Sequence, residues 1–329
     1  MNKRTTLRAL LALTSAGVGS LWTLQPAWSQ APATVRKVAV LEAGPPGPRE
    51  SFRRALTALG WREGLNLAIQ FVSTQNREEN IDALAATLVA GHPDAIVTSS
   101  ASTTRALQKA TSSIPIVMVY VVDPVGNGFA ASLARPGGNI TGLSNQQEDV
   151  LPKMAELLLQ IAPRTRKTGF LFNPRNPALT TYKATATRAA AALGIQPVLL
   201  TAESPTAIIE AVEQGAKRGV QALVVAADPL FSSHASLLAQ RINAARLPAI
   251  YGQKLHVQQG GLMSYGANRD ESWLRAAIYV DKILKGTRPA EIPIEQPTRF
   301  ELVVSAKAAL SLGLTIPHSI LLLATEVIE

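Results

Sequence analysis

The hydrophobic positions of this chain fall into short apolar runs separated by amphipathic segments. Some runs, such as 116–122, contain no charged position, which is typical of strands buried on both faces of a parallel sheet. The segments between them, such as 271–285, place apolar residues at helical spacing. This alternation predicts an α/β fold built from right-handed strand–helix–strand units. The expected strands are 37–42, 66–73, 95–98, 116–122, 140–143, 168–173, 196–201, 222–227, 249–251, 261–265 and 300–305.

One helix has unusually clear boundary signals. Ser204 is suited to cap its start and Pro205 to occupy its first position. Ile208 and Val212 follow at helical spacing, and Gly215 is expected just past the end. These signals predict a helix from 205 to about 214.

The strand series restarts near residues 142–145, which predicts two lobes with parallel, Rossmann-like sheets facing one cleft. The tail from 269 reads as a helix, a proline-rich stretch, one strand and a final helix. A tail of this form recrosses between lobes and predicts three hinge crossovers. The expected bounds are 35–143 plus 266–290 for the first lobe and 144–265 plus 296–329 for the second.

The first 29 residues have the features of a secretory signal peptide. Lys3, Arg4 and Arg8 precede an apolar stretch, and Ala27 and Ser29 supply the small residues of a cleavage site. We therefore expect cleavage after residue 29 and a periplasmic mature protein. No later segment has about 20 uninterrupted apolar residues, so we do not expect the mature protein to be embedded in a membrane.

Composition narrows the function classes further. The chain has no cysteine, which leaves no thiol for catalysis, metal binding or lipid anchoring. Its net charge of +9 falls to +6 without the three basic residues of the signal peptide. The remaining basic residues are scattered among acids, and only 5% of residues are aromatic, so we expect no nucleic-acid partner.

A cluster of small hydroxyl residues follows the expected strand 95–98. Ser99, Ser100, Ser102 and Thr103 stand where a helix begins, and free backbone N–H groups at a helix start attract anions. Plain helix capping needs only one Ser or Thr. The surplus of hydroxyls favours a site for a carboxylate.

Asp-Pro follows an apolar run once in each half of the chain. Asp123 and Asp228 therefore stand at the carboxyl ends of strands, where parallel sheets bind ligands. Asn173 and Asn176 follow another strand and offer amide donors and acceptors. Each of these residues is equally compatible with a turn or a helix cap.

Catalytic and metal-binding patterns are missing from the sequence. The four histidines stand alone, without a second ligand at metal spacing. The glycines at 137 and 138 are not followed by the Lys-Ser/Thr of a phosphate loop. We expect neither an enzyme, nor a cofactor, nor a metal.

Several longer motifs resemble one family. The string from Asp123 to Ser144 (DPVGNGFAASLARPGGNITGLS), the stretch 260–266 and the stretch 279–286 are similar to solute-binding proteins of ABC importers, the group that includes tryptophan- and tyrosine-binding components. The resemblance covers the mature chain and implies a type I periplasmic-binding-protein fold. It departs at 43–49, where the family usually has a longer loop, and at Ala267, where proline is commoner.

The resemblance implies a monomeric protein that captures an amino acid or similar small polar solute and presents it to an ABC permease. Ser100, Ser102 and Thr103 would hold the carboxylate, while Asp123 and Asp228 would take the ammonium or hydroxyl end. The second wall of the site would be lined by Asn173, Asn176, Tyr251 and Tyr265. Two alternatives stay open: a periplasmic ligand sensor for a receptor kinase, and a periplasmic enzyme on the same scaffold.

Overall fold

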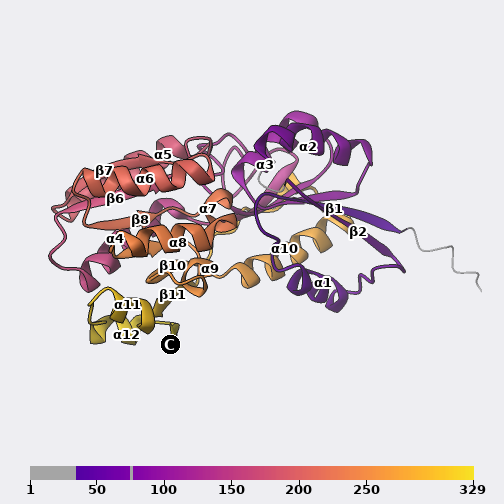
Figure 1. Cartoon of the computed structure of the whole chain (residues 1–329). Coiled ribbons are helices and arrows are strands. Elements are labelled where there is room, and N and C mark those ends of the chain that lie inside the picture. The colour runs from indigo at the N-terminus through magenta and orange to yellow at the C-terminus, as the bar shows by residue number, and fades with distance from the viewer. Residues whose placement is uncertain (1–34, 75–76) are drawn as a thin grey trace, which may run out of the picture. The chain divides into compact units, whose positions relative to one another are not determined.

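The computed structural model describes residues 35–74 and 77–329, so the predicted signal peptide lies outside the described residues. Strands and helices alternate along the chain, which confirms the α/β prediction (Figure 1). The strands are β1 (Arg36–Glu42), β2 (Leu67–Ser73), β3 (Ala95–Thr98), β4 (Ile116–Val121), β5 (Ile140–Ser144), β6 (Lys167–Phe172), β7 (Gln196–Thr201), β8 (Ala222–Val225), β9 (Ala249–Tyr251), β10 (Met263–Ala267), β11 (Phe300–Ser305) and β12 (Glu326–Ile328). The helices are α1 (Arg49–Ala58), η1 (Glu78–Asn80), α2 (Ile81–Ala90), α3 (Ala101–Ala110), α4 (Gln147–Ile161), α5 (Leu179–Ala192), α6 (Pro205–Lys217), α7 (Pro229–Ser233), α8 (Ala235–Ala244), α9 (Leu255–Gln258), α10 (Arg269–Leu284), η2 (Pro289–Glu291), α11 (Ala306–Ser311) and α12 (His318–Leu323).

The strands form two sheets. One has five strands in the order β2-β1-β3-β4-β5, and the other has seven in the order β12-β11-β10-β9-β8-β6-β7. The strands of the first sheet pair in parallel. In the second sheet β11 runs antiparallel to β10, and the other pairs are parallel. We call each sheet with its packed helices the first and the second lobe.

The core of the first lobe lies on both faces of its sheet. On one face, Phe52 of α1 and Trp273 of α10 meet edge to face with ring centroids 5.6 Å apart. On the other face, α2 and α3 contribute Leu88 and Leu107. Because both faces are covered, the central strands contain almost only apolar residues, as the sequence pattern predicted.

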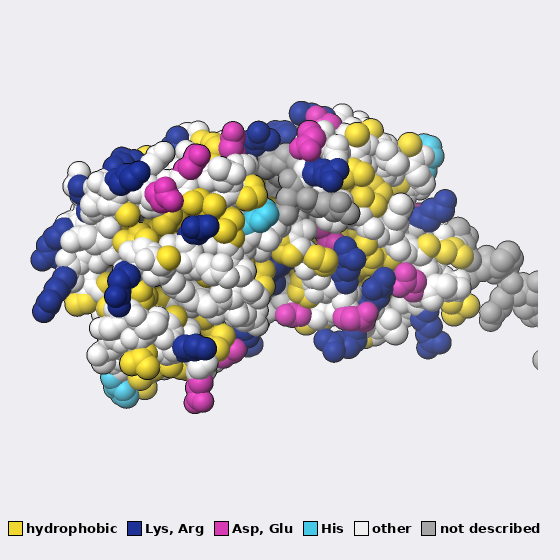
Figure 2. Space-filling view, in the orientation of Figure 1, with side chains coloured by type: hydrophobic (Ala, Val, Ile, Leu, Met, Phe, Trp, Pro, Cys, Tyr) yellow, Lys and Arg dark blue, Asp and Glu magenta, His cyan; other side chains and the backbone are white. Residues whose placement is uncertain are grey.

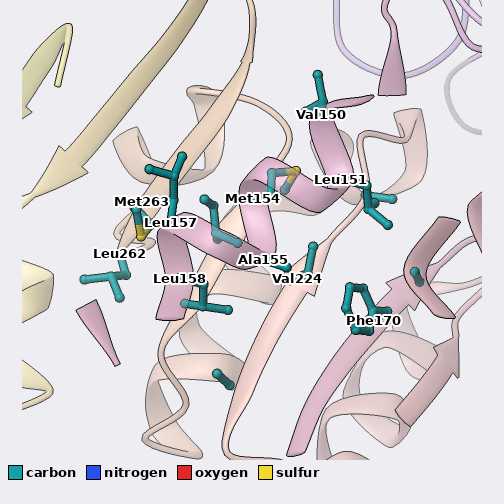
Figure 3. Close-up of a cluster of buried hydrophobic side chains, with 14 of the residues drawn as sticks. Val150, Leu151, Met154, Ala155, Leu157, Leu158, Phe170, Val224, Leu262 and Met263 are labelled. Atoms are coloured by element: carbon teal, nitrogen blue, oxygen red, sulfur yellow. The ribbon is translucent and has the colours of Figure 1, made fainter. Parts of the chain in front are cut away.

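The second lobe has the same layered build. Figure 3 shows Met154 and Leu158 of α4 packed near Phe170 of β6 and Val224 of β8. The opposite face of the sheet is covered by α6 and α8, whose buried residues form a separate cluster with β7 and β8. Each lobe therefore has its own hydrophobic core on the faces of its sheet. Polar side chains can then line the cleft between the lobes.

The chain crosses between the sheets at three places. It leaves the first sheet after Ser144, and it returns after Ala267 because α10 packs on β3, β4 and β5. It then passes from α10 to β11 of the second sheet, and Glu295 bridges to Leu143 on the way. These are the three crossovers that the sequence predicted.

Two details of the second lobe differ from the sequence prediction. Gly215 was expected beyond the end of its helix, but α6 continues to Lys217. Gly215 is instead a buried residue of this helix. It packs so closely on β7 that a Cβ there would lie 3.0 Å from a methyl group of Leu200. The turn after α6 uses Gly219, whose φ of 76° is the left-handed conformation expected of a terminating glycine.

The tail also differs. A single final helix was expected after β11, but α11 and α12 are followed by the short edge strand β12. The three residues of β12 are too few to show any periodicity, and only their pairing with β11 makes them a strand. The short helices α7 and α9 escaped prediction for the same reason.

A histidine lies in the core of the second lobe. His256 is fully buried, its ring stacks on that of Tyr251 at 4.8 Å, and each ring nitrogen lies 3.2 Å from a backbone carbonyl oxygen. Burial lowers the pKa of His256 from 6.5 to about 4, which outweighs the raising effect of the two carbonyls. The folded protein therefore keeps this ring neutral at neutral pH.

The unfolded chain binds a proton at His256 near pH 6.5, and the folded chain does so only near pH 4. The free energy of unfolding should therefore fall between pH 7 and pH 4 by up to about 3 kcal/mol through this residue. We expect His256→Gln to have a shallower slope over that range in urea titrations. The exposed residue His318 supplies the control, and His318→Gln should keep the wild-type slope. Equal slopes in all three proteins would contradict the prediction.

Candidate functional site

A cavity of about 40 Å³ lies where the carboxyl ends of strands from both sheets meet. The first lobe contributes residues that follow β1, β3, β4 and β5, and the second contributes residues that follow β6, β8 and β9. Its lining residues include Ser99, Ser100, Tyr120, Val122, Asn145, Asn176, Asp228, Ser232, Gln253, Arg269, Ser272 and Trp273. Parallel sheets carry ligand sites at this edge, so the cavity is the candidate site.

A second cavity of about 340 Å³ adjoins the first and shares Ser100, Asn176 and Asp228 with it. It adds Ser102 and Asn173 to the lining. Six of the ten residues predicted as ligand contacts thus border one continuous region: Ser99, Ser100, Ser102, Asn173, Asn176 and Asp228.

The hydroxyl cluster forms the start of α3. Ser100 caps the helix by accepting a hydrogen bond from the backbone N–H of Thr103. The hydroxyl of Thr103 is fully buried and lies 2.6 Å from that of Thr98. Thr103 therefore faces the lobe interior and lines neither cavity, while Ser99, Ser100 and Ser102 remain on the cavity side.

Asp228 connects three segments of the second wall. Its buried carboxylate accepts hydrogen bonds from the Asn173 amide at 3.0 Å, the Asn176 amide at 2.8 Å and the Leu230 N–H at 2.9 Å. The last of these caps α7. Asp228 thus acts as the helix cap that its sequence allowed, and its carboxylate also borders both cavities.

Asp123 makes one contact within its own lobe and one with the other lobe, and ligand contact by it stays a prediction. One carboxylate oxygen accepts the backbone N–H of Gly126 at 2.8 Å, and the other accepts the hydroxyl of Thr181 at 3.1 Å. Thr181 belongs to α5 of the second lobe, so this hydrogen bond joins the two lobes. Asp123 lines neither cavity.

The two predicted tyrosines lie away from the cavities. Tyr251 is fully buried in the second lobe, and its hydroxyl has no hydrogen-bond partner within the described chain. Tyr265 is partly buried and stacks on Phe300 with centroids 5.6 Å apart. Ligand contact by either residue stays a prediction.

Among the lining residues of the first cavity that sequence reasoning did not single out are Tyr120, Arg269 and Trp273. Tyr120 has a positive φ of 67° at an irregularity of β4, and its hydroxyl donates to the Gly252 carbonyl of the other lobe at 3.2 Å. Trp273 and Arg269 enter the lining from α10. Tyr120 was hidden inside an apolar run. The other two belong to a helix whose pattern indicates only its packing face.

The loop after β1 forms the remaining wall. The fully buried Glu42 accepts a hydrogen bond from the N–H of Gly47 at 2.7 Å and forms an ion pair with Arg49. Gly47 lies directly against the indole of Trp273, where no Cβ would fit. These contacts fix the short 43–48 segment against the cavity.

The chain belongs to the ABC transporter substrate binding protein family, whose model matches residues 47–328. Members of this family are solute-binding proteins. The two Rossmann-like lobes form the type I periplasmic-binding-protein fold, which other solute-binding proteins of ABC transporters share. The predicted family and fold are therefore confirmed.

Individual relatives agree with this assignment. A tyrosine-binding protein of Clostridioides difficile is 26% identical over 264 residues, which are 78% of this chain and 74% of the relative. The crystal structure of a conserved domain protein from Vibrio cholerae is 28% identical with a TM-score of 0.84, covering 89% of this chain and 100% of the other. An ABC domain from Streptococcus pneumonia in complex with L-Trp has a TM-score of 0.81 at 24% identity, covering 90% and 100%.

Basic and acidic side chains are mixed on the surface visible in Figure 2. Figure 2 shows Lys and Arg side chains spread over both lobes with Asp and Glu among them. Across residues 35–74 and 77–329, no helix is both long and apolar enough to span a bilayer. In the same ranges, no group of three His, Asp or Glu side chains is placed to hold a metal ion.

The hydrogen bond between Thr181 and Asp123 should favour the arrangement in which the lobes touch. Thr181→Val removes the hydroxyl at nearly constant volume. We expect it to lower the ratio of molecules with touching lobes to molecules with separated lobes by two- to tenfold. One hydrogen bond contributes about 0.5–1.5 kcal/mol to the free energy of such an arrangement. Distances between spin labels on α2 and α6 measure this ratio. Thr180→Val is the matched control, because Thr180 is exposed and makes no such bond. An unchanged distance distribution for Thr181→Val would contradict the role.

Proposed function

We propose that this protein is the periplasmic substrate-binding component of an ABC importer and that it captures an amino acid between its lobes. The observation that carries the proposal is the cavity that residues of both lobes line. One wall is the hydroxyl-rich start of α3, which favours a carboxylate, and the other holds Asp228, which favours an ammonium group. The tyrosine-binding relative and the L-Trp complex support the same ligand class.

Capture requires the lobes to separate and close. The first cavity of about 40 Å³, which we call the inner cavity, has room for only about three water molecules. That is too little for an amino acid. We expect a solute to reach the inner cavity from the adjoining cavity of about 340 Å³ when the lobes part at the three crossovers. Ligand binding then shifts the population toward the closed form, which the permease recognises.

A thermal-shift screen of amino acids and small organic acids tests the ligand class. A ligand at a hundredfold excess over its Kd stabilises the native state by about 2.7 kcal/mol. We expect the Tm to rise by about 5 °C with at least one amino acid. Conversion of that compound into a product during incubation would show an enzyme instead.

Ser102→Asp then localises the site. The new carboxylate suits the first turn of α3 but repels a ligand carboxylate, so the Tm of the free protein should hold while the ligand-induced shift shrinks. Ser319→Asp is the matched control, because Ser319 is likewise the second residue of its helix, α12, and lines neither cavity. Equal ligand-induced shifts in both variants would place the ligand elsewhere.

Export is tested separately. N-terminal sequencing of the mature protein from the periplasmic fraction should begin at Gln30, the residue after the expected cleavage site. Full-length protein retained in the membrane fraction would contradict the periplasmic assignment while leaving the ligand class untouched.

A further inference from the structure

Arg269 occupies a special place in the cleft. It is the first residue of α10, immediately after the chain crosses from β10 to the first lobe. It lines the inner cavity together with Ser100 and Asp228. It also borders a neighbouring cavity of about 500 Å³ on the side of the 43–48 loop. A ligand bound at Arg269 would therefore touch the protein at a hinge.

The side chain of Arg269 is partly buried, and its guanidinium has no bonding partner among the described residues. Within residues 35–74 and 77–329 it makes no hydrogen bond or ion pair, unlike Arg49 with Glu42 or Arg275 with Glu295. Burial lowers the pKa of Arg269, and this effect exceeds the opposing influence of its neighbours. A partly desolvated cation in this state is stabilised when an anion accompanies it.

The two acidic residues whose charges act on Arg269, Glu42 and Asp270, already accept other hydrogen bonds. Glu42 holds Gly47 and Arg49, as described above, and Asp270 accepts the hydroxyl of Ser51 at 2.7 Å. Tyr120 directs its hydroxyl to Gly252. These neighbours lower the free-energy cost of removing the guanidinium from water. They do not provide acceptors for its five N–H donors.

We propose that Arg269 is the anchor for the carboxylate of the captured solute, an inference that rests on the proposed function. A planar guanidinium binds a carboxylate through two parallel hydrogen bonds. The surrounding carboxylates of Glu42, Asp228 and Asp270 disfavour a doubly charged phosphate ester. With Asp228 in the same cavity, the ligand class becomes an α-amino acid bound as a zwitterion.

The first experiment needs no ligand. Removing a partly buried charge that has no partner should leave the free protein equally or more stable, so the Tm of Arg269→Gln should match or exceed the wild-type value. Arg275→Gln is the matched control on the same helix, and its Tm should fall because Arg275 forms a two-pronged ion pair with Glu295. A clear loss of Tm in Arg269→Gln would show that Arg269 supports the fold instead, and would overturn the proposal.

The second experiment uses a defined panel: the twenty L-amino acids, their carboxamides, small dicarboxylates and phosphate monoesters. In wild-type protein, calorimetry should find binders among the carboxylates but not their amides. Arg269→Gln should weaken them about ten- to a hundredfold, the loss expected for a charge-assisted bond. Arg269→Lys, which keeps the charge but not the fork, should fall between the two.

The outcomes separate this inference from the proposed function. Amino acids that bind wild type and Arg269→Gln equally would overturn the anchor but keep the amino-acid class. Dicarboxylates that bind through Arg269 while amino acids do not would keep the anchor and overturn that class. Phosphate esters or amides that bind as well as the carboxylates would overturn the assignment of a carboxylate.

Discussion

Two buried carboxylates and one partly buried guanidinium organise the cleft, because a charge removed from water must be matched by partners. Glu42 is saturated by Gly47 and Arg49 and thereby holds the loop of the first lobe. Asp228 is engaged by the amides of Asn173 and Asn176 and thereby holds the wall of the second lobe. These hydrogen bonds fix the backbone around the cavity. The third charge, Arg269, has no such partner among the described residues, which is why we propose it as the anchor for an anion.

The two lobes meet through a few small contacts. Tyr120 reaches the Gly252 carbonyl, Thr181 reaches Asp123, and a Cβ at Gly44 would come within 3.0 Å of the backbone of Pro229. These three contacts involve single side chains or backbone atoms, while most of the buried apolar residues pack within one lobe or the other. Such an interface can open at a cost of a few hydrogen bonds, which suits a binding protein that must admit and release its ligand.

The fold was readable from the sequence because burial on both faces of a parallel sheet leaves uninterrupted apolar runs. The expected strands at 95–98, 196–201, 249–251 and 300–305 have the bounds that the structure shows. The small β12 strand and the helix end near Gly215 were not readable, since both depend on contacts with distant residues. The sequence also showed that Ser100 and Asp228 follow strands directly. Residues in that position lie at the sheet edge where parallel sheets bind ligands, and both line the cavity.

The sequence by itself determined the two-lobed α/β build, the hydroxyl-rich start of α3 and the acid at the end of β8. Only the tertiary structure decided that Asp123 joins the lobes, that Tyr251 is enclosed in a core, and that Arg269 lines the inner cavity. The physical reason is the range of the interactions. Strand burial and helix capping involve neighbours in the chain, whereas the partner of a side chain across the cleft is set by how α10 and the three crossovers bring distant segments together.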